Sequence, residues 1–276
     1  MTARTLLITG CSSGIGYDAA HGMRERGWRV FASCRSLEDC TRLSAEGFDS
    51  PRIDYSDPAS ISSGLSEVLD ATGGTLDALF NNGAFACPGA VEDLPTDALR
   101  AVFEANVFGW HELTRQVIPV MRAQGHGRIV QNSSVLGFST LRMRGAYNAS
   151  KHALEGLTST LRIEMRKTPI HVVLIEPGPI TSKIRVNSIP HFERWIDWEN
   201  APARSLYEKR LIPRLYNSSG PDTFERPASA VTKKLIHALE SPRPRPRYFV
   251  TTPTHLLGAL RRILPTRALD WLQAKL

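Results

Sequence analysis

Short apolar runs alternate with stretches of helical periodicity along most of the chain. Residues 4–9 and 28–33 are apolar runs of the length expected for buried strands. The segment 17–26 between them has a helical pattern, and Gly27 ends it. The same alternation continues over residues 4–177, which predicts a mainly parallel sheet covered by helices on both faces.

The length of the chain and the absence of linkers indicate one domain. The 276 residues are enough for a sizeable core, and they contain no internal repeat or low-complexity linker. Residues 182–226 depart from the regular alternation, whereas residues 253–276 place apolar side chains at helical spacing. We therefore expect a single domain over 1–276 with an irregular insertion and a helical C-terminal extension.

A glycine-rich turn, T-G-C-S-S-G-I-G, joins the first predicted strand to the first predicted helix. Its glycines are Gly10, Gly14 and Gly16. Glycine lets the backbone approach a ligand closely, and the first N–H groups of a helix face an anion. Three residues separate the first two glycines, so the spacing differs from the general G-x-G-x-x-G fingerprint. A tight connection is the plain alternative, but the position between strand and helix favours a dinucleotide diphosphate.

The end of the second predicted strand bears on cofactor choice. NAD sites usually place an acid there to bind the ribose 2′-hydroxyl, whereas this chain has Ser33, Cys34 and Arg35. An arginine fork suits a 2′-phosphate, and Ser12 in the glycine turn adds a hydroxyl. The alternative is a solvated Arg35 with no ligand. We favour NADP(H) over NAD(H), since the missing acid and the added base agree.

A proton-transfer site is indicated by Y-N-A-S-K, which contains Tyr147 and Lys151, and by Ser134 thirteen residues upstream. Positions four apart share one helix face. We expect the Lys151 ammonium to lower the pKa of the Tyr147 phenol from about 10 toward the working pH. Ser134 then holds a substrate oxygen, whereas the adjacent Ser133 points to the opposite face of the strand.

Together these segments resemble the short-chain dehydrogenase/reductase family from Arg4 to about Thr181. Further matches in the expected order are N-N-G-A (81–84), N-V-F-G (106–109) and E-P-G-P-I-T (176–181). The departure is the order of Gly83 and Ala84, because the family usually has N-N-A-G. The glycine turn with F-A-S-C-R (31–35) resembles the NADP-preferring branch of 17-beta-hydroxysteroid and retinol dehydrogenase-like enzymes. L-I-E-P-G-P-I-T (174–181) and the arginine-rich C-terminus also resemble bacterial short-chain oxidoreductases or aldehyde reductases.

The resemblance implies four catalytic residues. Tyr147 exchanges a proton with the substrate oxygen, Ser134 hydrogen-bonds that oxygen, Lys151 lowers the tyrosine pKa and binds the nicotinamide ribose, and Asn106 holds a water that links Lys151 to solvent. A helix cap or a polar core contact is the alternative for Asn106. The reaction would interconvert a carbonyl and an alcohol.

The resemblance also implies a set of cofactor contacts. Asp54 would lie beside the adenine amine, although it is also compatible with a turn, with Asp57 near a helix cap. Asn82 would buttress the central strands as well as contact the cofactor, and Thr181 would hydrogen-bond the nicotinamide carboxamide. The complete predicted set is Gly10, Ser12, Ser13, Gly14, Ile15, Gly16, Arg35, Asp54, Tyr55, Asn82, Gly83, Ala84, Tyr147, Lys151, Pro177, Gly178, Ile180 and Thr181.

At the level of the whole molecule, the resemblance implies a doubly wound Rossmann domain with a mainly parallel seven-stranded sheet. It implies a substrate lid at 182–226, a homo-oligomer formed through helices at about 95–123 and 146–168, and apolar substrates such as a steroid, a retinoid or a lipid-like aldehyde. The alternative is a non-catalytic NADP-binding sensor or interaction protein. The presence of all four catalytic residues favours the enzyme.

The predicted lid is rich in aromatic side chains. Phe192, Trp195 and Trp198 recur every three residues, so they either line the site or pack on the body of the domain. His191 is a possible second proton-active group, although a surface position fits it better. The opposite wall of the site is predicted to contain Phe138, Leu141 and Met143.

Positive charge is concentrated at the C-terminal end. The formal net charge is +7, and residues 241–276 contain seven Arg or Lys and one acid. This basic amphipathic extension would cover the substrate pocket, pack between subunits or lie on an anionic membrane surface. We favour a cover or an interface, and no nucleic-acid motif accompanies the charge.

Cysteine usage and the first residues bear on location. Cys11, Cys34, Cys40 and Cys87 have no metal-ligand spacing and no evident disulfide framework, which is typical of reduced thiols. The first predicted strand begins within a few residues of Met1, so no signal peptide is expected. We expect a cytoplasmic protein, with peripheral membrane contact as the alternative.

Overall fold

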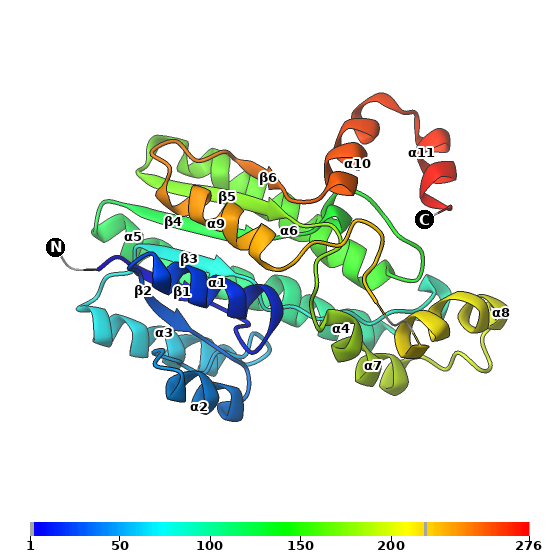
Figure 1. Cartoon of the computed structure of the whole chain (residues 1–276), viewed down its shortest axis with the longest axis horizontal. Coiled ribbons are helices and arrows are strands. Elements are labelled where there is room, and N and C mark those ends of the chain that lie inside the picture. Colours follow the sequence, from blue (N-terminus) through cyan, green and yellow to red (C-terminus); the bar gives the residue numbers. More distant parts are fainter. Residues whose placement is uncertain (1–2, 218–219, 276) are drawn as a thin grey trace.

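A six-stranded parallel sheet forms the centre of the molecule in the computed structural model, which describes residues 3–217 and 220–275 (Figure 1). The strands are ordered β2-β1-β3-β4-β5-β6. Their bounds are β1 Thr5–Ile8, β2 Arg29–Ala32, β3 Ala78–Asn81, β4 Gly127–Asn132, β5 Ile170–Glu176 and β6 Arg247–Phe249. The predicted doubly wound α/β fold is confirmed.

The predicted number of seven strands is wrong. Residues 49–53 run beside β2, but they form only isolated bridges, Phe31 with Asp49 and Cys34 with Arg52. Pro51 interrupts the ladder, because it has no N–H to donate to the Ala32 carbonyl. The Ser50 hydroxyl donates to that carbonyl instead, at 2.7 Å. The seventh strand is therefore reduced to an extended edge segment.

Two groups of helices cover the sheet (Figure 1). One face carries α1 Gly14–Glu25, α2 Leu37–Ala45 and α9 Ser229–Glu240. The other face carries α3 Pro58–Thr72, α5 Gly109–Ala123 and α6 Gly145–Glu164. The further helices are α4 Thr96–Phe103, α7 Ile184–Trp195, α8 Arg204–Leu206, α10 Thr252–Ile263 and α11 Thr266–Gln273.

The strands divide their apolar side chains between two cores. Leu6 and Ile8 of β1 pack against α1 and α9, whereas Leu7 packs against the helices of the other face. In β4, Val130 packs on the same face as Leu6 and Ile8, whereas Ile129 packs on the face of Leu7. Successive strand residues point to opposite faces, so continuous apolar runs are what a sheet buried on both faces requires.

The start and end of α3 follow from local chemistry. Asp57 caps the helix, since its carboxylate accepts hydrogen bonds from the N–H groups of Ala59 and Ser60. Pro58 occupies the first helical position, and Gly73 ends the helix with a left-handed conformation at φ +67°. The predicted helix cap at Asp57 is confirmed.

The C-terminal extension folds back onto the domain. Helices α10 and α11 stand beyond the carboxyl end of β6 (Figure 1). Gln273 of α11 is buried, and its amide bonds the Thr140 and Ser139 hydroxyls at 2.8 Å each. The extension therefore packs on the loop that joins Ser134 to Tyr147. Within the described ranges, no helix has the length and apolar character needed to cross a membrane.

Two helical glycines provide a matched test of the packing. A Cβ at buried Gly64 would lie 2.7 Å from the Arg52 carbonyl oxygen and 2.5 Å from Ile53 Cγ1, whereas a Cβ at exposed Gly156 meets nothing within 4 Å. Gly64→Ala is expected to lower the free energy of unfolding by about 1–3 kcal/mol through overpacking. Gly156→Ala is expected to raise it by about 0.5–1 kcal/mol. Urea unfolding measures both, and equal effects at the two positions would contradict the packing.

Candidate active site

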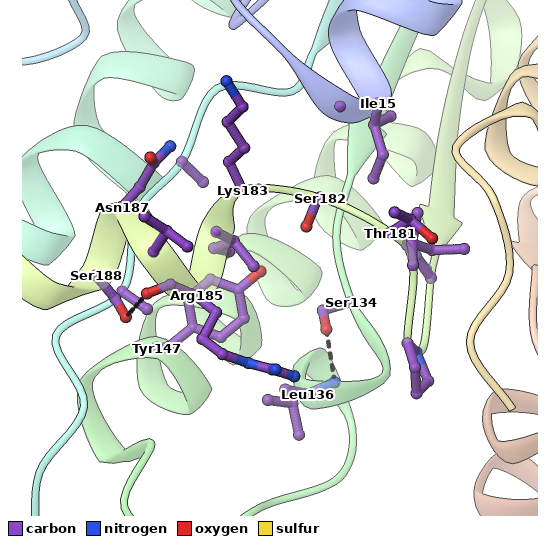
Figure 2. A pocket seen from close by; sticks show the side chains of 18 of the residues that line it. Ile15, Ser134, Leu136, Tyr147, Thr181, Ser182, Lys183, Arg185, Asn187 and Ser188 are labelled. Carbon is purple, nitrogen blue, oxygen red and sulfur yellow. Dashed lines mark hydrogen bonds between the residues drawn. The ribbon is translucent and has the colours of Figure 1, made fainter. Parts of the chain in front are cut away.

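A cleft of about 710 Å³ lies at the carboxyl ends of the strands. The glycine turn, the segment after β3, the end of β4, the first turn of α6 and the segment after β5 line it together with α7. Figure 2 shows Ile15, Ser134, Tyr147 and Thr181 around this cleft, although they come from distant parts of the sequence. Ligands of open α/β sheets bind at this edge.

The glycine turn is built for a close approach of backbone to ligand. Gly10 has φ +67°, and a Cβ there would lie 2.6 Å from the Cα of Gly83. A Cβ at Gly16 would lie 2.3 Å from the Gly10 carbonyl oxygen, so Gly16 allows α1 to pack closely on the turn. Ser13 precedes α1 in an extended conformation and its side chain makes no capping hydrogen bond. The helix N–H groups at the cleft therefore fit a diphosphate.

Two asparagines fix the turn against the centre of the sheet. Asn82 Nδ2 donates to the carbonyl oxygens of Thr9 and Gly10, at 3.0 and 3.3 Å. Asn132 Nδ2 donates to Asn82 Oδ1 at 2.8 Å. Asn82 thus buttresses the central strands, as expected, and its main chain together with Gly83 and Ala84 lines the cleft.

Lys151 is fully buried at the base of the cleft. Its Nζ donates to the Asn132 carbonyl oxygen at 2.9 Å and lies 4.2 Å from the centroid of the Trp110 ring. Burial lowers the pKa of the Lys151 ammonium to about 7, and the negative charge of Glu155 opposes this shift.

Tyr147 and Ser134 meet at the cleft wall. Burial raises the pKa of the Tyr147 phenol to about 12, and a hydrogen bond with Ser134 acts in the opposite direction. The predicted lowering of the Tyr147 pKa is therefore wrong for this arrangement. The Lys151 Nζ lies 5.6 Å from the centroid of the Tyr147 ring while it bonds the Asn132 carbonyl, and burial outweighs its charge.

Asn106 lies in a π-helical segment, Glu104–Phe108, between α4 and α5. Its side-chain amide accepts a hydrogen bond from the Phe85 N–H at 3.1 Å and donates to the Phe85 carbonyl at 2.9 Å. Nδ2 also lies 3.2 Å from the Ser150 hydroxyl, one residue before Lys151. Asn106 is buried behind the cleft wall, so the alternative of a polar core contact is present and the water relay stays a prediction. Such π-helical segments are frequent at functional sites.

Most of the predicted cofactor residues line the cleft. They are Gly10, Ser12, Ser13, Gly14, Ile15, Asn82, Gly83, Ala84, Tyr147, Lys151, Pro177, Gly178, Ile180 and Thr181. The side chain of Thr181 donates to Glu225 Oε1 at 2.7 Å, so its bond to a carboxamide stays a prediction. A Cβ at Gly178 would lie 2.1 Å from Thr251 Oγ1, which keeps this turn close to the body.

Four predicted cofactor residues do not line the cleft. Gly16 has the packing role described above, and Arg35 is exposed at the end of β2. The Tyr55 phenol is buried, within 2.6 Å of both Thr9 Oγ1 and Asn81 Oδ1, so its side chain belongs to the core. Asp54 Oδ1 accepts from the Ser56 N–H at 3.0 Å, which is the turn that the sequence also allows.

The three aromatics at positions 192, 195 and 198 of the lid pack on the domain, whereas Tyr216 of the lid lines the cleft. Phe192, Trp195 and Trp198 belong to an apolar cluster with Tyr207, and Tyr207 donates to Asp93 at 2.7 Å. Of the predicted opposite wall, Leu141 lines the cleft. Phe138 instead packs on Phe249 and Met143 on the lid cluster, so those two assignments are wrong. Of the two alternatives for Phe192, Trp195 and Trp198, packing on the body of the domain is the one observed, because all three lie in this apolar cluster.

His191 is neither a surface residue nor a cleft residue. Its ring stacks on Phe85 with centroids 4.0 Å apart, and its carbonyl oxygen accepts from Cys87 Sγ. Burial lowers the pKa of His191, and the charges of Arg35 and Arg194 add to this shift. His191 therefore fastens α7 to the body.

A group of charged lining residues escaped the sequence analysis. They line the cleft from the N-cap of α6 and from the lid, and they are Arg144, Arg185, Arg214 and Asp222. Arg144 stands immediately before α6 as its N-cap residue, in a non-helical conformation, so helical spacing from Tyr147 does not predict its place in the cleft. The lid has no regular periodicity, so nothing in the sequence brings the other three together.

Comparisons with known proteins agree with this architecture. The pattern of the short chain dehydrogenase family matches residues 4–191. The chain is 37% identical over 267 residues to the uncharacterized oxidoreductase YbbO of Escherichia coli, covering 97% of this chain and 93% of YbbO. It is 29% identical to the NADPH-dependent 3-dehydrocapnine reductase of Ornithobacterium rhinotracheale, covering 97% and 95% of the two chains.

A solved structure extends the comparison to three dimensions. The short chain dehydrogenase/reductase of Burkholderia phymatum in complex with NAD has a TM-score of 0.77 and 26% sequence identity, over 94% of this chain and 92% of that chain. The chain belongs to the short-chain dehydrogenase/reductase family. It is an oxidoreductase of the class that interconverts alcohols and carbonyl compounds.

The buried ammonium of Lys151 predicts a pH-dependent stability. The group loses its proton near pH 7 in the folded protein and near pH 10.5 in the unfolded chain. Between these values the unfolded chain binds more protons, so the contribution of Lys151 to stability rises with pH from 7 to 10.5. Thermal unfolding of the wild type and Lys151→Met should show a wild-type advantage that grows over this range. Lys167→Met, at an exposed lysine, is the control, and a difference independent of pH for Lys151→Met would contradict the burial.

Proposed function

We propose that the protein interconverts an aldehyde or ketone and an alcohol on an apolar substrate, with NADP(H) as the hydride carrier. The observation that carries this proposal is the convergence of Ser134, Tyr147 and Lys151 on a cleft that also contains an uncapped helix N-terminus. When bound, the cofactor would supply or accept the hydride. The side chains of the protein transfer the proton to or from the substrate oxygen.

Tyr147 is the proposed general acid in the reducing direction. Its pKa of about 12 means that the hydroxyl is protonated at neutral pH and has a proton to give to the carbonyl oxygen. Ser134 donates a hydrogen bond to the same oxygen as negative charge develops on it. Lys151 lies one helical turn below Tyr147, where its charge favours the tyrosinate that remains.

The preference for NADP(H) rests on Arg35. The main-chain carbonyl of Arg35 accepts from Arg52 Nε at 3.0 Å, and Arg52 in turn pairs with Asp54 and Asp57. The Arg35 guanidinium itself is exposed at the end of β2, where an acid would bind a ribose hydroxyl in an NAD enzyme. The NADPH dependence stated for the Ornithobacterium relative supports the same choice.

An apolar substrate fits the walls of the cleft. Leu136 and Leu141 contribute one side, and Ile184, Val186 and Ile189 contribute the lid side. Apolar walls with a few polar groups are typical of small-molecule sites. A steroid, a retinoid or a lipid-like aldehyde has this chemistry.

Association of subunits is part of the proposal. Exposed apolar side chains lie at the two long helices that the resemblance implies for oligomer contacts, with Phe108 immediately before α5 and Leu157 and Ile163 on α6. Large apolar side chains exposed on a helix favour burial against a partner. A second copy of the chain is the expected partner.

Substitution of the general acid tests the reaction. Tyr147→Phe removes one hydroxyl and is expected to reduce kcat by a factor of about 10²–10⁴, because the proton donor is lost. The measurement is NADPH oxidation with a panel of aldehydes, ketosteroids and retinal, and fluorescence titration checks that NADPH still binds. Activity that survives Tyr147→Phe would refute the mechanism.

Cofactor choice is tested at Arg35. Arg35→Ala is expected to weaken NADPH binding by roughly ten-fold or more and to leave NADH binding nearly unchanged, since a charge-assisted bond to the 2′-phosphate is lost. Arg100→Ala, at an exposed arginine on α4, is the control. Equal weakening of both cofactors by Arg35→Ala would show that Arg35 does not recognise the 2′-phosphate.

A further inference from the structure

Three arginines surround one carboxylate in the lid half of the cleft. Arg185 Nη2 and Arg214 Nη2 both donate to Asp222 Oδ2, at 2.6 and 2.8 Å. Arg144 lines the same cleft from the position immediately before α6. A single carboxylate therefore lies among three guanidinium groups.

Arg144 feels the other two arginines directly. Burial lowers its pKa to about 10, and repulsion by Arg214 and Arg185 adds to this shift, whereas Asp222 opposes it. Its hydrogen bond within the described residues is a long one, from Nη1 to the neighbouring Met143 carbonyl at 3.4 Å. A half-buried guanidinium with so weak a partner has donors left for a ligand.

The remaining charges on this side of the cleft do not remove the excess. Glu225 adds a second carboxylate to this side, whereas Lys183 points away from Arg185 in Figure 2 and its charge acts on Asp39. The Glu225 oxygens are already engaged, since Oε1 accepts from Thr181 and Oε2 accepts from the Asp222 N–H at 2.8 Å. Three arginines therefore face two carboxylates among the described lining residues of this half.

The cluster lies close to the reacting centre. Figure 2 shows the Arg185 side chain extending from α7 in the direction of Leu136 and Ser134, into the same cleft that Tyr147 borders. Leu136, Ile189 and Leu215 provide apolar surface on this path. The cleft thus combines apolar walls with a cationic patch, and a purely apolar substrate would leave the excess positive charge over Asp222 unbalanced.

A purely structural role explains only part of this arrangement. Asp222 and either of its two arginines would be enough to pin the lid. The second arginine on the same carboxylate oxygen, and Arg144 beside them, add desolvation cost and repulsion between like charges. An incoming anion relieves that repulsion, and guanidinium groups are the preferred ligands of carboxylate and related oxyanions.

We propose that Arg144, Arg185 and Arg214 bind an anionic group of the substrate, so that the enzyme acts on a carbonyl compound with an apolar chain and a carboxylate or an equivalent oxyanion. This inference rests on the proposed carbonyl–alcohol function and adds the class of substrate. Tyr147 and Ser134 would hold the carbonyl oxygen, while the arginines fix the charged end.

The experiment compares matched charged and neutral substrates. A series of medium-chain oxo acids, with the carbonyl at increasing distance from the carboxylate, is assayed beside the corresponding methyl esters with NADPH. For at least one spacing, kcat/KM of the acid is expected to exceed that of the ester by roughly ten-fold or more, since charge-assisted hydrogen bonds are lost in the ester. High salt should reduce this ratio.

Variants assign the selectivity to the arginines. Arg214→Gln is expected to bring the acid-to-ester ratio close to one through the KM of the acid, while the KM of NADPH stays the same. Arg214→Lys, which keeps the charge, should retain part of the ratio. Arg210→Gln, at an exposed arginine of the same lid segment that does not line the cleft, is the matched control and should retain all of it.

The outcomes separate this inference from the proposed function. If the wild type reduces esters as well as acids at every spacing, or if Arg210→Gln lowers the ratio as much as Arg214→Gln, the inference is wrong and the carbonyl reductase stands. If no carbonyl compound is reduced, the proposed function is wrong, and the inference is then tested by the binding of a carboxylate alone. In that case decanoate, but not decanol, should raise the Tm of the wild type and not that of Arg214→Gln, and equal shifts would overturn it.

Discussion

The site depends on the burial of one ammonium group. Lys151 is buried, and a buried charge is costly unless a hydrogen-bond partner is supplied. The partner is the Asn132 carbonyl at the end of β4, while the Asn132 amide holds Asn82 and Asn82 holds the Gly10 carbonyl. One chain of hydrogen bonds therefore joins α6, β4, the segment after β3 and the glycine turn. The proton-transfer group and the diphosphate-binding turn are fixed relative to each other by this chain.

The C-terminal part of the chain contacts α6, the helix that carries Lys151. Arg247, the last arginine of P-R-P-R-P-R, contacts Glu155 of α6 at 2.5 Å and also bonds Glu176 at the end of β5. Burial and the charge of Glu155 raise the pKa of Glu176 to about 8. The basic character of this segment is therefore not wholly a surface property. Arg247 pairs with Glu155, one turn beyond Lys151, and with Glu176 on β5, and these contacts tie β6 to α6 and to the sheet.

The sequence predicts those parts of the molecule that local chemistry determines. The strands from β1 to β5, the cap at Asp57 and the cleft positions of Ser134, Tyr147 and Lys151 follow from apolar runs, capping residues and motif spacing. The prediction of a seventh strand is wrong because Pro51 lacks a main-chain N–H donor. The pattern of apolar residues alone does not reveal this loss. The predicted lowering of the Tyr147 pKa is wrong for a different reason. Helical spacing predicts that Lys151 is near Tyr147, but it does not predict that the phenol is buried, and burial raises the pKa of the phenol.

The packing of the lid explains why the sequence did not predict its charged residues at the cleft, Arg185, Arg214 and Asp222. Phe192, Trp195 and Trp198 form an apolar cluster around Tyr207. The Tyr207 hydroxyl donates to Asp93 and accepts from the Ala90 N–H at 2.8 Å. This cluster fastens the lid to the body from outside the cleft, so the polar side chains remain for the inner face. The position of Arg214 is then set by the apolar packing of Leu215 and its neighbours as well as by Asp222. Removal of the Arg214 charge therefore changes the electrostatics of the cleft more than the placement of the lid.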